Sequence, residues 1–193
     1  VLRRELGEAD YRRTEASWRE AGSPGATVVV AATRRELVVD VSVFGRALHG
    51  TTPLAENPLD NEHPDVNCDG VQIHLKLETA AGAAAATWLL VPEGTGAGDD
   101  ERVRLSARDA AAGSRVHATW RPLDRGWRLV ARIERAGLPG VPTAVDVLVN
   151  ERPPARERRR GQLVLSGANG EWAYLRGDRQ PLDRLIPIVI RDE

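Results

Sequence analysis

The stretch from Asn57 to Leu77, NPLDNEHPDVNCDGVQIHLKL, leads from an acidic loop into an alternating segment. In the second half, apolar and polar side chains fall on opposite faces, with Val71, Ile73, Leu75 and Leu77 on one face and Gln72, His74, Lys76 and Glu78 on the other. This period of two predicts a β-strand that packs on one side. The first half is dense in carboxylates and amides. Such a loop can hold a metal ion or direct polar groups at a ligand, and it also occurs as a solvated turn.

Eight further segments have strand character: 27–32, 36–43, 85–91, 102–108, 115–120, 127–133, 143–150 and 185–190. Alternation within them is consistent; in segment 36–43, for example, the apolar residues are Leu37, Val39, Val41 and Val43. No long helical pattern separates the segments. Nine strand candidates without a long helix predict an all-β protein, an antiparallel β-sandwich of two sheets.

One pairing and two long insertions follow from the spacing of these segments. The connection Arg121–Gly126, RPLDRG, has the length and the Pro, Asp and Gly of a hairpin turn, and it predicts that 116–120 pairs with 127–133. The segments 44–69 and 151–180 interrupt the rhythm of the strands. Loops of this length within a domain are usually functional or disordered.

Length and charge limit the function. The chain has 193 residues, which suits one domain, and its 27 basic and 28 acidic residues give a formal net charge of −1. This balance argues against a nucleic-acid partner, and no apolar run is long enough to predict a membrane span. The chain begins at Val1 and contains no Met, so we expect a piece of a longer protein. We expect residues 1–25 to form an N-terminal arm anchored by Trp18, and residues 26–193 to form the sandwich.

The acidic loop is a candidate calcium site. Its segment Asp65–Gly70 matches the opening D-x-N-x-D-G of a helix-loop-helix calcium loop, but the twelfth position is Lys76 where a bidentate Glu is needed. A calcium site of another kind, built from Asp60, Asp65, Asn67 and Asp69, stays open beside the alternative of a solvated turn. The single cysteine, Cys68, lies in this loop, where carboxylates would raise the pKa of its thiol, so we expect a small, partly buried loop residue rather than a reactive nucleophile.

The segment 171–180, EWAYLRGDRQ, gathers aromatic rings with guanidinium and carboxylate groups. Rings of this kind pack on the C–H faces of a pyranose, while planar polar groups take its hydroxyls. The alternative is a strand whose Trp172 and Tyr174 enter the core and whose charged residues tie loops together. Trp88, Trp120 and Trp127 lie within predicted strands, and we expect them in the core.

An enzymatic role has no support in the motifs. The sequence has no nucleophile elbow, phosphate-binding loop, paired cysteines or zinc-protease helix motif. The four histidines are scattered, and His74 and His117 fall on outward strand positions, where we expect surface or hydrogen-bonded side chains. A haem-binding sandwich would need a pair of histidines, or a histidine and another ligand, facing one pocket.

Several segments together resemble a known family. They are Trp18, ELVVDVSV at 36–43, DGVQIHL at 69–75, GWRLVARIE at 126–134, AVDVLVNE at 144–151 and EWAYLRGDRQ at 171–180. Their order and character, from Trp18 to the end, are similar to those of the family-9 carbohydrate-binding modules and the wider group of DOMON-like sandwiches. The resemblance implies a jelly-roll-like sandwich, appended to a larger secreted protein, that binds sugar ends between aromatic rings and sometimes holds structural calcium.

Two functional hypotheses follow. The first is a non-catalytic carbohydrate-binding module, outside the cell or in the periplasm, with ligand contacts from Trp172, Tyr174, Arg176, Asp178, Arg179, Asn150 and Glu62. The second is a structural domain without a small-molecule ligand, whose acidic and Arg-rich loops form ion pairs with other domains of the parent chain. Exposure of Trp172 and Tyr174 would favour the first hypothesis, and burial would favour the second.

Overall fold

A computed structural model describes residues 1–48, 64–94, 101–109, 111, 113–153, 159–168, 170–173 and 179–189. The strands in these ranges are β1 (Leu2–Leu6), β2 (Tyr11–Arg13), β3 (Gly25–Ala32), β4 (Glu36–Phe44), β5 (Gly70–Thr79), β6 (Gly82–Pro92), β7 (Glu101–Asp109), β8 (Val116–Leu123), β9 (Gly126–Glu134), β10 (Val141–Glu151), β11 (Gly161–Val164) and β12 (Ile186–Pro187). Three short 3-10 helices are η1 (Glu8–Asp10), η2 (Pro64–Asn67) and η3 (Arg135–Gly137). None of the described helices is long and apolar enough to cross a membrane.

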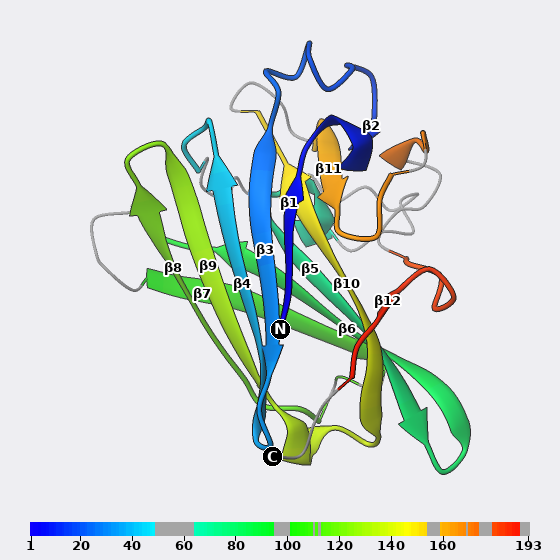
Figure 1. Ribbon diagram of the computed structural model, residues 1–193. Coiled ribbons are helices and arrows are strands. Elements are labelled where there is room, and N and C mark those ends of the chain that lie inside the picture. The colour runs from blue at the N-terminus through cyan, green and yellow to red at the C-terminus, as the bar shows by residue number, and fades with distance from the viewer. Residues whose placement is uncertain are drawn as a thin grey trace.

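The strands form two antiparallel layers, as predicted (Figure 1). Sheet A has the order β1-β3-β4-β9-β8, and sheet B has the order β7-β6-β5-β10-β11-β2, with β12 beside the first half of β10. Strand β7 joins the layers, because its first residues pair with β8 and the rest of it pairs with β6. The structure thus contains more strands than the nine expected, and the additional ones are β1, β2 and β11.

The N-terminal arm belongs to both sheets. Strand β1 pairs with β3 at the edge of sheet A, and after η1 the chain crosses to sheet B, where β2 pairs with β11. Trp18, the expected anchor, packs against the core, and its Nε1 donates to the carbonyl of Pro24 at 2.7 Å. The arm closes one side of the sandwich and β7 closes the other.

Alternation in the sequence fixes which face of each strand is buried. In β4, all four residues of the apolar face are buried, while Asp40 on the outer face accepts from Nε and Nη2 of Arg128 on β9, at 2.8 Å and 2.5 Å. Trp88, Trp120 and Trp127 are buried, as predicted.

The predicted hairpin is confirmed, with a shorter turn than its sequence suggested. Strands β8 and β9 pair up to Leu123 and Gly126, which leaves a turn of two residues, Asp124 and Arg125. Gly126 has φ 144°, and a Cβ there would lie 1.9 Å from the carbonyl oxygen of Val43 on β4. Only glycine fits this close approach of two strands.

Candidate ligand-binding site

The outer face of sheet B is polar and yet buried. On most sandwiches such a face meets water, but here η2 and the residue after it, Cys68, pack on β6, and Ser166 and Gln180 bond to β10. Its buried polar side chains come from five strands and are Arg12, Gln72, His74, Thr87, Asp146, Asn150 and Gln162. A buried polar group without a partner costs about 1–3 kcal/mol, so we follow these groups through their hydrogen bonds.

Asn150 on β10 lies at the centre of a network of planar groups. Its Oδ1 accepts from Nε2 of Gln72 at 3.0 Å and from Nε2 of Gln162 at 2.9 Å. Nη1 of Arg12 donates to Oε1 of Gln162 at 3.3 Å. The buried Nδ2 of Asn150 has no hydrogen-bond partner in the described part of the chain. The described chain therefore offers Nδ2 no acceptor, and Asn150 is one of the residues that the sequence nominated as ligand contacts.

His74 on β5 extends this network towards β6. Because Nε2 of Gln72 donates to Asn150, Oε1 of Gln72 is the acceptor, and it lies 3.3 Å from Nε2 of His74. The network therefore assigns the proton to Nε2 of His74. In a neutral ring, Nδ1 then accepts from the hydroxyl of Thr87 at 3.3 Å. His74 is thus an outward residue with satisfied hydrogen bonds, as predicted, although it is buried.

A second branch of the network reaches the C-terminal segment. Nη2 of Arg12 donates to Oε2 of Glu171 at 3.2 Å and to Oε1 of Gln180 at 3.4 Å. Nε2 of Gln180 donates to Asp146, which also accepts from the hydroxyl of Ser166 at 2.6 Å. Burial raises the pKa of the Asp146 carboxyl, and these hydrogen bonds oppose the rise in part. Side chains from β2, β10 and the C-terminal segment are therefore held in fixed orientations.

The network opens into a groove of about 370 Å³, which we call the sheet-B groove. Its lining includes His74, Thr87, Arg108, Arg179 and Gln180. Its size lies in the range of about 300–1,000 Å³ that is usual for small-molecule sites. Guanidinium, amide, hydroxyl and imidazole groups converge there on held positions. This chemistry suits a ligand with many hydroxyl groups, each of which both donates and accepts.

The predicted site residues lie in different places. Asn150 belongs to the network and Arg179 lines the groove. Trp172 is half-buried at the β2 edge, where its backbone forms an isolated parallel β-bridge with Arg13. The guanidinium carbon of Arg13 lies 4.1 Å from the centre of the Trp172 ring. The other predicted contacts lie outside the described residues; they are Glu62, Tyr174, Arg176 and Asp178.

Two carboxylates of the predicted calcium loop bind arginines. Asp65, in η2, accepts from Nε and Nη2 of Arg104 at 2.9 Å each. Oδ1 of Asp69 accepts from Nη2 of Arg46 at 2.6 Å and from the backbone N–H of Arg152 at 2.8 Å. Asn67 ends η2, and Asp60 lies outside the described residues. Within the described ranges, no group of three or more His, Cys, Asp or Glu residues is placed to hold a metal.

The acidic loop packs against the outer face of β6. Val66 and Cys68 form a small apolar cluster with Leu89 and Val91. Cys68 is buried, and burial, followed by the charge of Asp65, raises the pKa of its thiol to about 11. Cys68 is thus more deeply buried than the partly buried loop residue that the sequence predicted, and the direction of its pKa shift is the predicted one. Asp69 and the backbone of Arg152 also join the acidic and Arg-rich segments to each other, so this contact lies within the chain rather than across a domain interface.

Several residues of the network were not among the predicted contacts, namely Arg12, Gln162, Asp146 and Gln180. Gln72 and His74 showed in the sequence as polar positions on an alternating strand. Alternation distinguishes the outer face from the inner one, but it does not reveal that another segment covers the outer face. For Arg12 and Gln162, which lie in strands of three and four residues, no such periodic signal exists.

Neither a protein-family model nor a curated protein matches the sequence. Among solved structures, the chain is similar to a family-9 carbohydrate-binding module from Caldicellulosiruptor kristjanssonii in complex with glucose, with TM-score 0.59 and 16% identity over 98% of this chain and 85% of that one. It is also similar to a family-9 module from the same organism in complex with cellotriose, with TM-score 0.52 and 16% identity over 86% of this chain and 74% of that one. The chain therefore has the β-sandwich fold of the family-9 carbohydrate-binding modules.

Proposed function

We propose that this protein is a non-catalytic carbohydrate-binding module that takes a neutral saccharide in the sheet-B groove. The observation that carries the proposal is the ordered network of amide and guanidinium groups that leads from Asn150 to the groove. Preorganised planar groups bind hydroxyls without a further loss of side-chain entropy. The solved structures of the same fold hold glucose and cellotriose, which makes these two sugars the first ligands to test.

In this proposal Arg179 and Gln180 contact the sugar hydroxyls from the C-terminal segment, and the Thr87 hydroxyl, which His74 orients, accepts from them on the sheet. Within the described part of the chain, no Trp, Tyr or Phe lines the groove. Binding would then depend on hydrogen bonds more than on stacking, and we expect dissociation constants in the micromolar to millimolar range. Trp172 and the other predicted contacts, including Tyr174, Arg176, Asp178 and Glu62, are part of the proposed ligand surface.

The test is a titration of the isotope-labelled protein with glucose and cellotriose, followed by NMR chemical shifts. We expect shifts at His74, Thr87 and Gln180. We expect Arg179→Ala to weaken binding by about tenfold or more, since a hydrogen bond from a charged group contributes about 1.5–3 kcal/mol. Arg121→Ala is the matched control, because Arg121 is also exposed and lies outside the groove.

Two results would overturn the proposal. One is the absence of shifts at any groove residue with a broad panel of neutral mono- and oligosaccharides. The other is saccharide binding that Arg179→Ala leaves unchanged and Trp172→Ala abolishes, which would place the site at the β2 edge instead. The proposal that the module is attached to further domains is tested separately, by sequencing the gene beyond the two ends of this chain.

A further inference from the structure

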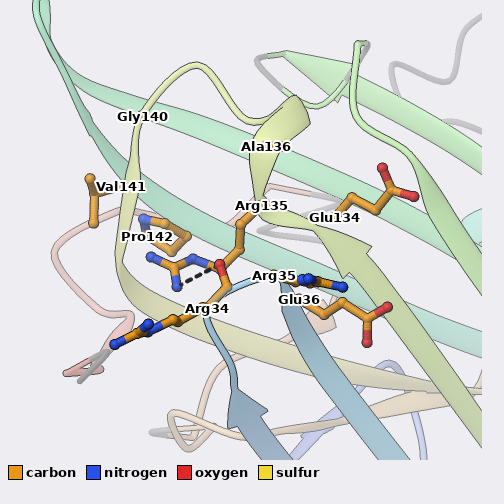
Figure 2. Close-up of a pocket in the computed structure, with 9 residues that line it drawn as sticks. All are labelled: Arg34, Arg35, Glu36, Glu134, Arg135, Ala136, Gly140, Val141 and Pro142. Carbon is orange, nitrogen blue, oxygen red and sulfur yellow. Dashed lines mark hydrogen bonds between the residues drawn. The ribbon is translucent and has the colours of Figure 1, made fainter. Parts of the chain in front are cut away.

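A second hollow lies where the β3–β4 turn meets the connection from β9 to β10, and we call it the hairpin-end pocket. Its volume is about 540 Å³, and its lining is drawn in Figure 2. No residue lines both this pocket and the sheet-B groove. Three of its side chains are arginines, Arg34, Arg35 and Arg135, and two are glutamates, Glu36 and Glu134. The pocket is therefore a separate feature with a small excess of positive charge.

Arg135 holds the frame of this pocket. Its Nη1 donates to the carbonyl oxygens of Thr33 at 2.8 Å and Arg34 at 3.3 Å, and its backbone N–H donates to the carbonyl of Arg35 at 2.8 Å. The turn and the connection are thus tied together by three hydrogen bonds. Gly140 adds a close approach, since a Cβ there would lie 2.4 Å from the carbonyl oxygen of Glu78. The hollow is consequently built into the fold rather than left by the chance position of one side chain.

The charges of the pocket are separated in space. Figure 2 shows the Arg135 guanidinium beside Pro142, with Arg34 on the same side of the turn and Val141 near by. Arg35 extends to the other side, where Glu36 and Glu134 lie. Among the described residues, the side chains of Arg34 and Arg35 have no hydrogen-bond or ion-pair partner, and both are exposed. One end of the pocket is therefore cationic with an apolar wall, and the other carries carboxylates.

This division selects a class of ligand. A guanidinium group binds a carboxylate by charge-assisted hydrogen bonds. Oε2 of Glu36 already accepts from Nη1 of Arg132 at 3.3 Å, so its other oxygen and the carboxylate of Glu134 are the acceptors for hydroxyl groups. These two carboxylates also disfavour a ligand with a second negative charge, such as phosphate or sulfate. Val141 and Pro142 offer apolar surface for the C–H face of a ring. A hydroxylated ring that carries one carboxylate has all three features.

We propose that the hairpin-end pocket binds a hexuronic acid, as a free sugar or as a residue of an acidic glycan, with its carboxylate at Arg34 and Arg135 and its hydroxyls towards Glu36 and Glu134. The assignment rests on the residues of this pocket alone. It does not require the sheet-B groove to bind a neutral sugar.

The test is an NMR titration of the chain with glucuronate, beside glucose as the neutral analogue that differs only in a CH₂OH group in place of the carboxylate. We expect shifts at the amides of Arg34, Arg35, Arg135 and Val141 with glucuronate and not with glucose. We expect Arg34→Gln to weaken glucuronate binding by about tenfold or more, as loss of a charge-assisted contact does. Because Arg34 is exposed on a turn, this variant should keep its fold, which the spectrum itself will show.

Arg121→Gln, which removes one positive charge elsewhere, and Arg179→Ala, which tests the sheet-B groove, should leave glucuronate binding unchanged. The inference is overturned if glucuronate shifts no residue of the pocket, if its binding is lost in Arg179→Ala and kept in Arg34→Gln, or if inorganic sulfate binds the pocket as well as glucuronate does. Failure here with glucose still bound at the groove would leave the proposed function intact. Glucuronate binding at the pocket with no neutral sugar at the groove would overturn the proposed function and support the inference about the pocket.

Discussion

Asp146 shows how much one buried side chain can determine. It lies at 0% exposure on the outer face of β10 and accepts hydrogen bonds from Ser166 and Gln180, which join the C-terminal segment to sheet B. Burial makes its charged form costly, and this is the first cause of its raised pKa. The residue therefore organises the groove at some cost in stability at neutral pH.

That cost predicts a pH dependence. The carboxyl titrates near pH 4 in the unfolded chain and at a higher pH in the folded one, so the native state binds the proton more tightly. The resulting stabilisation is complete below the unfolded pKa and is lost as the pH rises through the native pKa. We expect the free energy of unfolding of the wild type, relative to Asp146→Asn, to fall between pH 4 and pH 8. Urea unfolding of both proteins at a series of pH values measures this difference in free energy. A difference that does not vary with pH would contradict the prediction.

Sequence reasoning succeeded for residues whose neighbours in the chain determine their environment. Cys68 is a partial example: burial against β6 is the first cause of its raised pKa, and the charge of Asp65, which lies in the same loop, is the second. The ligand contacts of Asn150 and Arg179 stay predictions, although the structure places the first in the network and the second in the lining of the groove. Arg12 was not nominated as a ligand contact, because its partners Gln162, Glu171 and Gln180 are all more than a hundred residues away along the chain. Such long-range contacts depend on the order of the strands in the sheet, and the local pattern of apolar and polar residues does not determine that order.

At the scale of elements, η2 and β7 form a unit through Asp65 and Arg104. Arg104 also donates to Glu93 at 2.5 Å, so one guanidinium ties η2, the end of β6 and β7 together. The contact holds Val66 and Cys68 over the outer face of β6. The acidic loop thus has a structural role in the described chain whether or not it also binds an ion.

This arrangement gives a direct test of calcium binding by the loop. We expect Asp65→Asn to lower the free energy of unfolding by about 1.5–3 kcal/mol, the usual contribution of hydrogen bonds to a charged group, because the ion pair with Arg104 is lost. The loss should be the same in EDTA and in millimolar calcium, measured by thermal unfolding. A larger loss in calcium would show instead that Asp65 ligates the ion together with other residues of the predicted set.

Long strands were predictable and short ones were not. Each of β4 and β9 has four alternating apolar residues that face the core, and their periodicity identifies them without any tertiary information. The segment 185–190 was expected to be a strand, and in the described chain only Ile186 and Pro187 pair with β10. Strands β1, β2 and β11 are short, and β1 is rich in charge, so what makes them strands is the presence of an open edge in the neighbouring sheet.

At the scale of the molecule, the arm of the first thirteen residues completes both sheets. It buries Leu6, Tyr11 and Arg12, and the Tyr11 hydroxyl donates to Oε2 of Glu151 at 3.0 Å. Its removal would expose the edges of β3 and β11 and leave Gln162 without its arginine. We expect a chain that lacks residues 1–13 to melt about 10 °C or more below the full chain, since 1 kcal/mol corresponds to roughly 2–4 °C at this size. An unchanged melting temperature would show that the arm contributes little to the sandwich.

The position of β2 also bears on how the protein is made. Its partner β11 lies about 150 residues further along the chain. At a synthesis rate of about 5–20 residues per second, β2 leaves the ribosome roughly 8 to 30 seconds before β11 does. During that interval a strand with unsatisfied backbone groups has no native partner, whereas β1 finds β3 almost at once. Charged residues are a general means of keeping an unpaired strand from associating with others, and β2 contains Arg12 and Arg13 and closely follows Glu8 and Asp10.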